Sequence, residues 1–477
     1  MAARTSRRSG PVAAAAAVAL VLGAGGYLVA DAHDVVPGFL TLEPVPPPPS
    51  PFPVAPAAQE PPPLEIVLPP VDVDVPVPDA QELTALARAA ADHEWMGDSV
   101  GIVVADQLTG EVLVDVDGDR PRTPASTAKM ATGFAAVRAL GPDARLATTV
   151  VQAGSGRLVL VGGGDVMLAQ GAGDPTAVNG HAGLADLADQ VVLRLELAGV
   201  DEVALDVDDT FFTGPRLAPG WADTDLSGGF VAPVTALMVN IAKTREEPYP
   251  PRHRDPSLHA AQVLAAALEE RGVTVTGAPT RTEAPEGATV LGMVESATLR
   301  DVVAYSLQTS DNTVSEALGR VTAHARGLPT SFQGATRAVI AEMTDAGLDT
   351  TGAVLADCSG LADGSWLPAR LLVDLVVLSA DPTDTATLPV AVDMPVAGWQ
   401  GTLAERLTST PARGLVRAKT GSLRGVTSLS GTVVTVEGRP LVFAVLADQT
   451  PPGGQLGPRR VIDTFVQQLA GCGCGLP

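Results

Sequence analysis

The N-terminal segment is apolar over a length close to that of a membrane span. A run of apolar and small residues extends from Val12 to Ala30, and several arginines precede it. About 20 apolar residues suffice to cross a bilayer, so the run is long enough for a membrane anchor. Ala30-Asp31-Ala32 also matches the small residues of a signal-peptide cleavage site. The pattern predicts a signal peptide or a membrane anchor over residues 1–36, and the arginines favour export of everything that follows.

The next segment, residues 37–78, is dominated by proline. It contains the runs Pro46-Pro47-Pro48-Pro49 and Pro61-Pro62-Pro63. Proline has no backbone N–H to donate, so this segment cannot be a packed helix or sheet. Such sequences favour the extended polyproline II conformation and act as semi-rigid spacers. We therefore expect a linker that holds a folded module away from the N-terminal segment.

The folded part begins near Asp79, where the apolar pattern becomes periodic. Leu83 and Leu86 recur at helical spacing, and Asp79 is a typical helix N-cap. Two β-rich runs, at 100–105 and 111–116, follow and predict a hairpin. The pattern thus predicts a helix followed by two antiparallel strands.

Composition limits the class of function. The chain has 477 residues, 46% of them hydrophobic, which is enough for two or three domains with cores. With 31 Lys and Arg against 54 Asp and Glu, its net charge of -23 repels phosphate backbones and makes nucleic acid an improbable partner. Its six histidines form no H-E-x-x-H motif or Cys/His cluster, so we expect no metal and no cofactor.

The first chemical motif is Ser126-Thr127-Ala128-Lys129. Phe134 and Val137 follow it at helical spacing, so Ser126 is expected in the first turn of a helix. Residues i and i+3 share a helix face, which brings the Ser126 hydroxyl within reach of the Lys129 amine. A lysine with a depressed pKa can accept the proton of such a serine. An ordinary helix start is the alternative, but Lys129 is one of only three lysines in the chain.

The second and third motifs are Ser310-Asp311-Asn312 and Lys419-Thr420-Gly421-Ser422. The former precedes a helical stripe and, taken alone, is most simply an N-cap. The latter reads as the end of a strand that enters a hairpin, and taken alone it is an ordinary turn. A strand edge with a cation and a hydroxyl can also bind an extended peptide and its terminal carboxylate. The third lysine, Lys243, lies in a polar stretch and is interpreted as a solvated surface charge.

S-x-x-K, S-D-N and K-T-G in this order are the signature set of penicillin-binding proteins and class A β-lactamases. Four other segments sharpen the match: Val161–Asp165, Asp208–Phe212, Asp357–Leu361 and Pro395–Leu403. From about Asp79 to Gln468 the chain resembles the exported D-alanyl-D-alanine carboxypeptidase/endopeptidase family, which are low-molecular-mass penicillin-binding proteins with a large insertion between the first two motifs.

The resemblance implies an α/β (α+β) fold. We expect a transpeptidase/β-lactamase-like domain whose antiparallel sheet is flanked by helices, together with a β-containing inserted domain. The expected division is 79–150 and 286–470 for the two parts of the main domain, 151–285 for the insertion, and 471–477 for a tail.

The resemblance also implies a role for each motif residue. Ser126 would attack the terminal D-Ala-D-Ala bond, Lys129 would take its proton, and Ser310 would protonate the departing D-alanine. The substrate would be bound by Asn312, Lys419, Thr420 and Gly421. The backbone N–H groups of Ser126 and Ser422 would form the oxyanion hole, a type of interaction that contributes about 10²–10³ in rate per donor in another serine hydrolase.

The implied partners are peptidoglycan stem peptides as substrates and β-lactam antibiotics as acylating inhibitors. A β-lactamase, a transpeptidase and a catalytically silent wall-binding protein remain as alternatives. The balance between carboxypeptidase and endopeptidase activity stays open as well.

Cysteine usage suggests one disulfide in an exported protein. The three cysteines are Cys358, Cys472 and Cys474. We expect a bridge from Cys358 to the C-terminal tail, and no catalytic thiol.

Overall fold

The computed structural model describes residues 25, 27–33, 35–36, 73–408 and 411–472. The chain divides into two compact units, Met1–Val71 and Asp72–Pro477. Most of the expected signal or anchor segment and nearly all of the proline-rich linker lie outside the described residues. Within the residues that are described, no helix combines the length and the apolar character needed to cross a membrane. The fold below is that of the second unit.

A five-stranded sheet forms one end of this unit, with strand order β2-β1-β10-β9-β8. Its members are β1 (Val100–Asp106), β2 (Val112–Val116), β8 (Val416–Leu423), β9 (Val426–Val434) and β10 (Pro440–Ala447). All neighbouring strands pair antiparallel. The expected hairpin of the two early runs is confirmed, and the strand that carries the third motif, β8, lies at the sheet edge.

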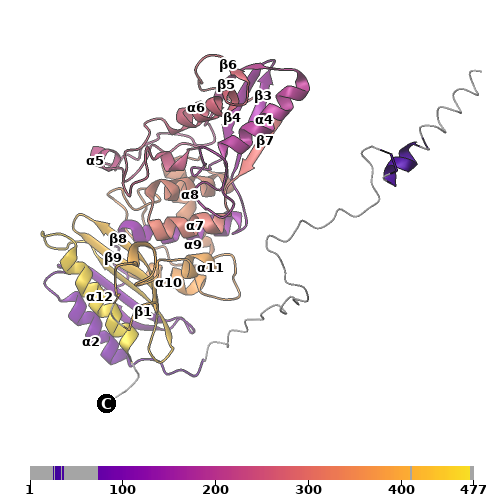
Figure 1. Cartoon of the computed structure of the whole chain (residues 1–477). Helices are drawn as coiled ribbons and strands as arrows, with labels where there is room; N and C mark the ends of the chain where they lie inside the picture. Colours follow the sequence, from indigo (N-terminus) through magenta and orange to yellow (C-terminus); the bar gives the residue numbers. More distant parts are fainter. Residues whose placement is uncertain (1–24, 26, 34, 37–72, 409–410, 473–477) are drawn as a thin grey trace, which may run out of the picture. The chain divides into compact units, whose positions relative to one another are not determined.

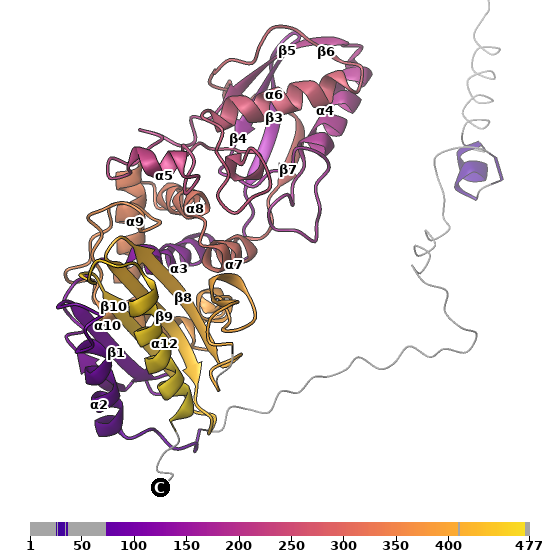
Figure 2. The ribbon, with the colours of Figure 1, turned by 60° about the vertical axis from the view of Figure 1, so that its left-hand side comes forward.

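Helices cover both faces of this sheet. On one face α2 (Ala80–Ala91) and α12 (Leu456–Gly471) lie side by side, as Figures 1 and 2 show. Asp79 caps α2 by accepting hydrogen bonds from two backbone N–H groups, as its sequence position predicts. The apolar faces of both helices pack on alternate residues of the central strands, including Phe443 and Leu429. On the other face α10 (Ala369–Ser379) contacts β1, β9 and β10.

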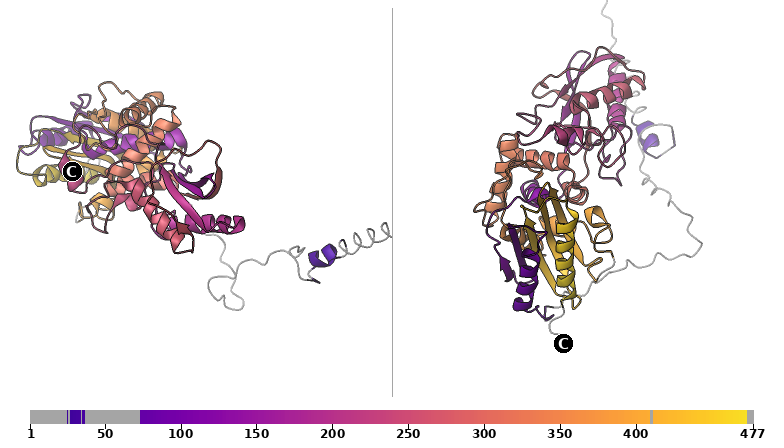
Figure 3. Two further views of the ribbon diagram at one scale, coloured as in Figure 1. Left: turned by 90° about the horizontal axis from the view of Figure 1, so that it is seen from above. Right: turned by 90° about the vertical axis from the view of Figure 1, so that its left-hand side faces the viewer.

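A helical layer occupies the middle of the unit. It consists of α3 (Ala128–Leu140), α7 (Leu299–Thr309), α8 (Asn312–Ala325), α9 (Phe332–Asp345) and the short α11 (Leu388–Val392). Helix α3 contacts α7, α8, α9 and α10, and every residue from Ala128 to Val137 is buried. This explains why the sequence pattern of α3 is apolar on all sides. In the right view of Figure 3 the orange-brown helices of this layer lie between the yellow and purple sheet and the magenta one.

A second sheet, of order β6-β5-β4-β3-β7, lies beyond the helical layer in Figure 1. Its strands are β3 (Ala147–Gly154), β4 (Arg157–Gly162), β5 (Glu202–Asp208), β6 (Thr274–Val275) and β7 (Thr289–Glu295). The helices α4 (Leu184–Ala198) and α6 (Pro256–Glu269) pack on it, and the five-residue helix α5 (Asp223–Ser227) follows β5 in the chain. The two parallel pairs, β4 with β5 and β5 with β6, need the long crossovers that these helices provide.

These layers confirm the expected fold: an antiparallel sheet flanked by helices, with a β-containing region between its first and last strands. The second sheet begins at Ala147 and ends at Glu295, so it extends past both limits of the range 151–285. The exact domain boundaries remain a prediction.

The expected disulfide is wrong for Cys472. Cys358 and Cys472 are free, and each belongs to a different hydrophobic cluster. Cys358 is fully buried against α8, whereas Cys472 follows α12 at the opposite face of the first sheet. Cys474 lies outside the described residues.

The contact between Cys358 and α8 gives a test of this packing. A Cβ atom at Gly319, in the middle of α8, would overlap the Cys358 sulfur. Alanine is the better helix former by up to about 1 kcal/mol, but overpacking a full core costs about 1–3 kcal/mol. We expect Gly319→Ala to lower the free energy of unfolding, measured by chemical denaturation, and a second change, Cys358→Ala, to restore part of it. A more stable Gly319→Ala variant would contradict the packing.

Candidate active site

Ser126 and Lys129 lie where a single turn of 3-10 helix, η1 (Ala125–Thr127), runs into α3. The Lys129 Nζ donates to the Ser126 Oγ at 3.1 Å, so the expected contact between residues i and i+3 is confirmed. The same nitrogen donates to Asn312 Oδ1 at 2.6 Å and to the carbonyl of Ser359 at 2.7 Å. Lys129 is 1% exposed, and Ser126 is only partly buried. The lysine thus joins three segments beneath a serine that solvent can reach.

Burial sets the protonation of this lysine. It lowers the pKa of Lys129 from 10.5 to about 8, because an ammonium loses its hydration inside the protein. The carboxylates of Asp357, Glu316 and Asp311 oppose the shift. A lysine with this pKa is partly neutral near physiological pH and can serve as a base.

Ser310 lies between two helices in an unusual backbone conformation. It ends α7 with a φ of 59°, in the left-handed region, and Asp311 begins α8 by accepting from the N–H groups of Thr313 and Val314. The second motif therefore lies at a helix start, as the sequence predicts. The Ser310 Oγ accepts a hydrogen bond of 2.8 Å from the Lys419 Nζ, which links the second and third motifs.

Lys419 is as deeply buried as Lys129. Its side chain is 0% exposed, and its Nζ also donates to the carbonyl of Thr420 at 3.0 Å. Burial, together with the nearby charge of Lys129, lowers the pKa of Lys419 well below its usual value. Each lysine therefore donates to the hydroxyl of a motif serine and to a backbone carbonyl.

Gly421 allows β8 to approach the serine. A Cβ there would overlap the Ser428 hydroxyl and would lie 2.6 Å from the carbonyl oxygen of Pro124. That carbonyl accepts from the Ser428 Oγ at 2.7 Å, so strand β9 is fastened to the turn before Ser126. On β8 itself Thr420 is half-buried and Ser422 is exposed.

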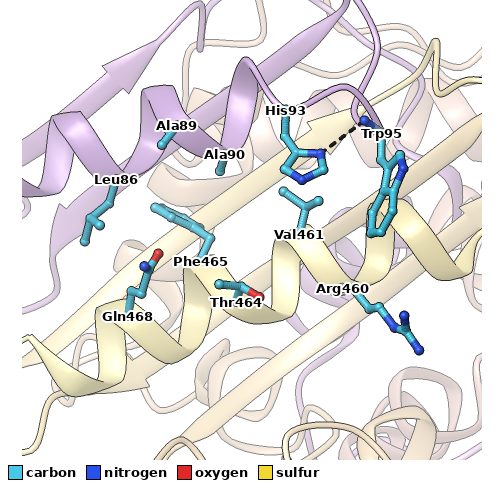
Figure 4. Close-up of a pocket in the computed structure, with 10 residues that line it drawn as sticks. All are labelled: Leu86, Ala89, Ala90, His93, Trp95, Arg460, Val461, Thr464, Phe465 and Gln468. Carbon is cyan, nitrogen blue, oxygen red and sulfur yellow. Dashed lines mark hydrogen bonds between the residues drawn. The ribbon is translucent and has the colours of Figure 1, made fainter.

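The motif residues meet at one cleft of about 700 Å³. It is lined by Ser126, Ser310, Asn312, Thr420, Gly421 and Ser422, while Lys129 and Lys419 lie beneath its surface. The structure thus brings together every site residue that the sequence singled out. A second, smaller groove between α2 and α12, shown in Figure 4, contains none of them.

Two buried carboxyl groups support Lys129 from below, and sequence reasoning gave neither a role. Asp357 accepts from the side chains of Trp221 and Ser359 and from three backbone N–H groups of its own loop. These bonds fix the Ser359 carbonyl that accepts from Lys129. Glu316, on α8, accepts from the backbone N–H of Cys358, and burial raises its pKa to about 8. The segment 357–361 was noted only for its family resemblance.

A buried ion pair joins the chain segment between β5 and β6 to the second motif. Arg252 donates to Asp311 Oδ2 at 3.2 Å, and the two side chains are 4% and 9% exposed. Arg252 also donates to the carbonyls of Gly229 and Ile241. Asn312 adds a bond from its Nδ2 to the carbonyl of Phe230. Asp311 and Asn312 are therefore held from the side of the inserted sequence.

Lys243, expected to be a solvated surface charge, lies at the cleft. It is half-buried and lines the cleft. It follows the short turn η2 (Asn240–Ala242), whose residues all have left-handed φ values of 46°, 54° and 57°. Such values are costly for residues other than glycine, and Arg252 holds this turn through the Ile241 carbonyl.

Across the part of the chain that the structure describes, no three His, Cys, Asp or Glu side chains gather in an arrangement that could hold a metal ion.

The chain is similar to known proteins over most of its length. The sequence profile of the "D-Ala-D-Ala carboxypeptidase 3 (S13) family" matches residues 82–252 and 242–469. Carboxypeptidase DacB of Mycolicibacterium smegmatis is 37% identical over 403 residues, which are 82% of this chain and 84% of that protein. The D-alanyl-D-alanine carboxypeptidase of an Actinomadura species is 29% identical over 455 residues, 78% of this chain and 81% of that protein.

Among solved structures, penicillin binding protein 4 (dacB) from Haemophilus influenzae has the same fold. It covers 82% of this chain and 98% of its own, with a TM-score of 0.66 at 21% identity. A second structure of that protein, complexed with a β-lactam, covers 81% of this chain and 98% of its own, with a TM-score of 0.60 at 22% identity.

The buried pair at the second motif gives a stability prediction. Arg252→Met would leave the Asp311 carboxylate buried without its partner, which costs about 3–5 kcal/mol. We expect a lower free energy of unfolding in chemical denaturation, and partial recovery when Asp311→Asn is added, because asparagine can still cap α8.

Arg254→Met is the matched control, since Arg254 is exposed only two residues further along the chain. It should change stability by no more than about 0.5 kcal/mol. Equal effects of Arg252→Met and Arg254→Met would show that the ion pair does not hold the second motif.

Proposed function

The chain belongs to the D-Ala-D-Ala carboxypeptidase 3 (S13) family and is a serine-type D-Ala-D-Ala carboxypeptidase; on this premise we propose that it hydrolyses the terminal D-Ala-D-Ala bond of peptidoglycan stem peptides through an acyl-enzyme on Ser126. One observation carries the proposal. A lysine whose pKa is lowered to about 8 lies 3.1 Å from the hydroxyl of a serine that lines a cleft. This pairing supplies a nucleophile and its base in one helical turn.

In the acylation step, the neutral amine of Lys129 accepts the proton of the Ser126 hydroxyl as its oxygen attacks the carbonyl carbon of the penultimate D-alanine. The C–N bond then breaks, and the nitrogen of the departing D-alanine needs a proton. Ser310 supplies it and regains one from Lys419, whose Nζ lies 2.8 Å from the Ser310 Oγ. Burial lowers the pKa of Lys419, which favours this release.

The developing oxyanion is stabilised by the backbone N–H groups of Ser126 and Ser422. Gly421 supports this assignment, because a side chain there would prevent β8 from approaching the turn before Ser126. The substrate extends along β8, the edge strand of the sheet, with Thr420 and Gly421 beside it. Asn312 holds the amide of the acyl group. Water then attacks the ester carbonyl and passes a proton through Ser310 to the neutral Lys419, Lys129 returns its proton to the Ser126 oxygen, and the acyl product leaves.

β-Lactam antibiotics would acylate the same serine, because their strained amide presents a carbonyl to the same nucleophile. The β-lactam complex of the Haemophilus influenzae protein, which shares the fold, is consistent with this. We also propose that the protein is exported, since its substrate lies outside the cytoplasm and its N-terminal apolar run follows several arginines.

The alternatives differ in what happens after acylation. A silent wall-binding protein would not need the buried pair of lysines, whose desolvation costs free energy. A β-lactamase would hydrolyse the penicilloyl ester rapidly, whereas the carboxypeptidase retains it long enough to be labelled. A transpeptidase would pass the acyl group to an amine.

The first test follows free D-alanine released from a pentapeptide that ends in D-Ala-D-Ala, with and without penicillin. We expect penicillin-sensitive release by the wild-type protein. Ser126→Ala should abolish both D-alanine release and covalent labelling by a fluorescent penicillin. Labelling that persists in Ser126→Ala would contradict the assignment of Ser126 as the nucleophile.

A second test uses pH. Because the pKa of Lys129 is lowered to about 8, only roughly a tenth of it is neutral at pH 7. We therefore expect the second-order rate constant of penicillin acylation to rise nearly tenfold per pH unit below pH 7 and to level off above about pH 8. A rate that stays flat down to pH 6 would mean that Lys129 is not the base.

A further inference from the structure

The buried position of Lys419 leaves a carboxylate-bearing leaving group without a cation at the cleft surface. Lys419 is 0% exposed and donates to the Ser310 Oγ and the Thr420 carbonyl. It does not line the cleft. Two of its three N–H donors are thus engaged, and its side chain lies beneath the cleft surface. We therefore expect another cationic side chain to face the carboxylate of the leaving group in the cleft.

Arg459 lies at the required place. It belongs to the first turn of α12, lines the cleft, and donates from its Nη2 to the Ser422 Oγ at 3.1 Å. Ser422 is the exposed residue that follows Gly421 on β8. Arg459 forms no ion pair within 73–408 and 411–472, because the nearest acid on its helix, Asp463, is paired with Arg406.

The remaining cations of the cleft are committed or lie elsewhere. Arg252 is neutralised by Asp311, and Arg406 by Asp463. Lys243 is joined through its backbone to Arg252, on the side of the cleft that Asp311 and Asn312 form. Burial and then Arg406 lower the pKa of the Arg459 guanidinium, and Asp463 raises it. The end of the cleft at Ser422 is thus positive in a chain whose net charge is -23.

We propose that Arg459 binds the terminal carboxylate of the departing D-alanine, together with the hydroxyls of Thr420 and Ser422, and so selects substrates whose leaving group ends in a free carboxylate. The proposal rests on the function proposed above. A guanidinium presents two parallel N–H groups that match the two oxygens of a carboxylate, which an ammonium cannot do. One Nη already points at Ser422, so the guanidinium is oriented before the substrate arrives.

The test compares two reactive N-acyl-D-alanyl thioesters that differ in one group. The leaving group of the first is thioglycolate, which carries a carboxylate, and that of the second is the corresponding carboxamide. Both are hydrolysed through the same acyl-enzyme, and a thioester reacts readily enough for the neutral substrate to be measured. We expect the wild-type protein to prefer the carboxylate substrate.

Arg459→Gln should raise KM for the carboxylate substrate about ten-fold and leave kcat within about three-fold, because the contact exists in both ground and transition states. Its kcat/KM for the carboxamide substrate should change by less than two-fold. Arg459→Lys should keep part of the preference for the carboxylate substrate, because the positive charge remains. It should lose the rest, because an ammonium lacks the two parallel N–H groups of a guanidinium.

Arg460→Gln is the matched control. Arg460 is the next residue on α12 and lines the separate groove between α2 and α12, where Figure 4 shows it beside Val461 and Trp95. The change in net charge is the same as in Arg459→Gln, so a general loss of positive charge would affect both variants equally. We expect Arg460→Gln to retain the wild-type preference.

Equal losses on both substrates in Arg459→Gln would overturn the proposal, because they would reveal a structural role through Ser422. An unchanged preference in that variant would overturn it as well. Failure of the proposed function gives a different result: the wild-type protein would then hydrolyse neither thioester and take up no fluorescent penicillin.

Discussion

The active site depends on the burial of one ammonium group. Lys129 is 1% exposed, and its three hydrogen bonds reach Ser126, Asn312 and the carbonyl of Ser359. Removing a charge from water costs several kcal/mol, and these charge-assisted bonds offset that cost only when all three oxygens are in place. The same loss of hydration brings the pKa of Lys129 to about 8. One constraint therefore both assembles three distant segments and gives the lysine the pKa that its proposed role as a base requires.

The oxygens around Lys129 are held in turn by residues far away in the sequence. Trp221, which lies in the chain between β5 and β6, donates a hydrogen bond to Asp357. Asp357 in turn fixes the loop that presents the Ser359 carbonyl. Arg252, from the same stretch, fixes Asp311. The sequence that separates the first two motifs is thus part of the support of the site, in addition to forming a sheet of its own.

Local patterns predicted the elements that carry the motifs, the family resemblance implied the fold, and long-range contacts account for what both missed. The spacing of Ser126 and Lys129, the cap at Asp311 and the edge strand around Lys419 all follow from periodicity within a few residues. The position of Lys243 at the cleft depends on a left-handed turn that Arg252 holds. Neither this turn nor the parallel pairing of β4 with β5 has a local signature. Cys358 was misread because only the fold separates it from Cys472.

The lysines and arginines around the cleft occupy different kinds of position. Only three of its 31 basic residues are lysines, and the two that lie beneath the cleft are those placed where burial lowers a pKa. A guanidinium in those places would stay charged and could not exchange a proton. Binding requires the opposite property, a charge that persists at every working pH, and an arginine at the exposed rim provides it. In the proposed mechanism, proton transfer and recognition of the leaving group therefore belong to different side chains. Titration near pH 8 changes the first and leaves the second intact.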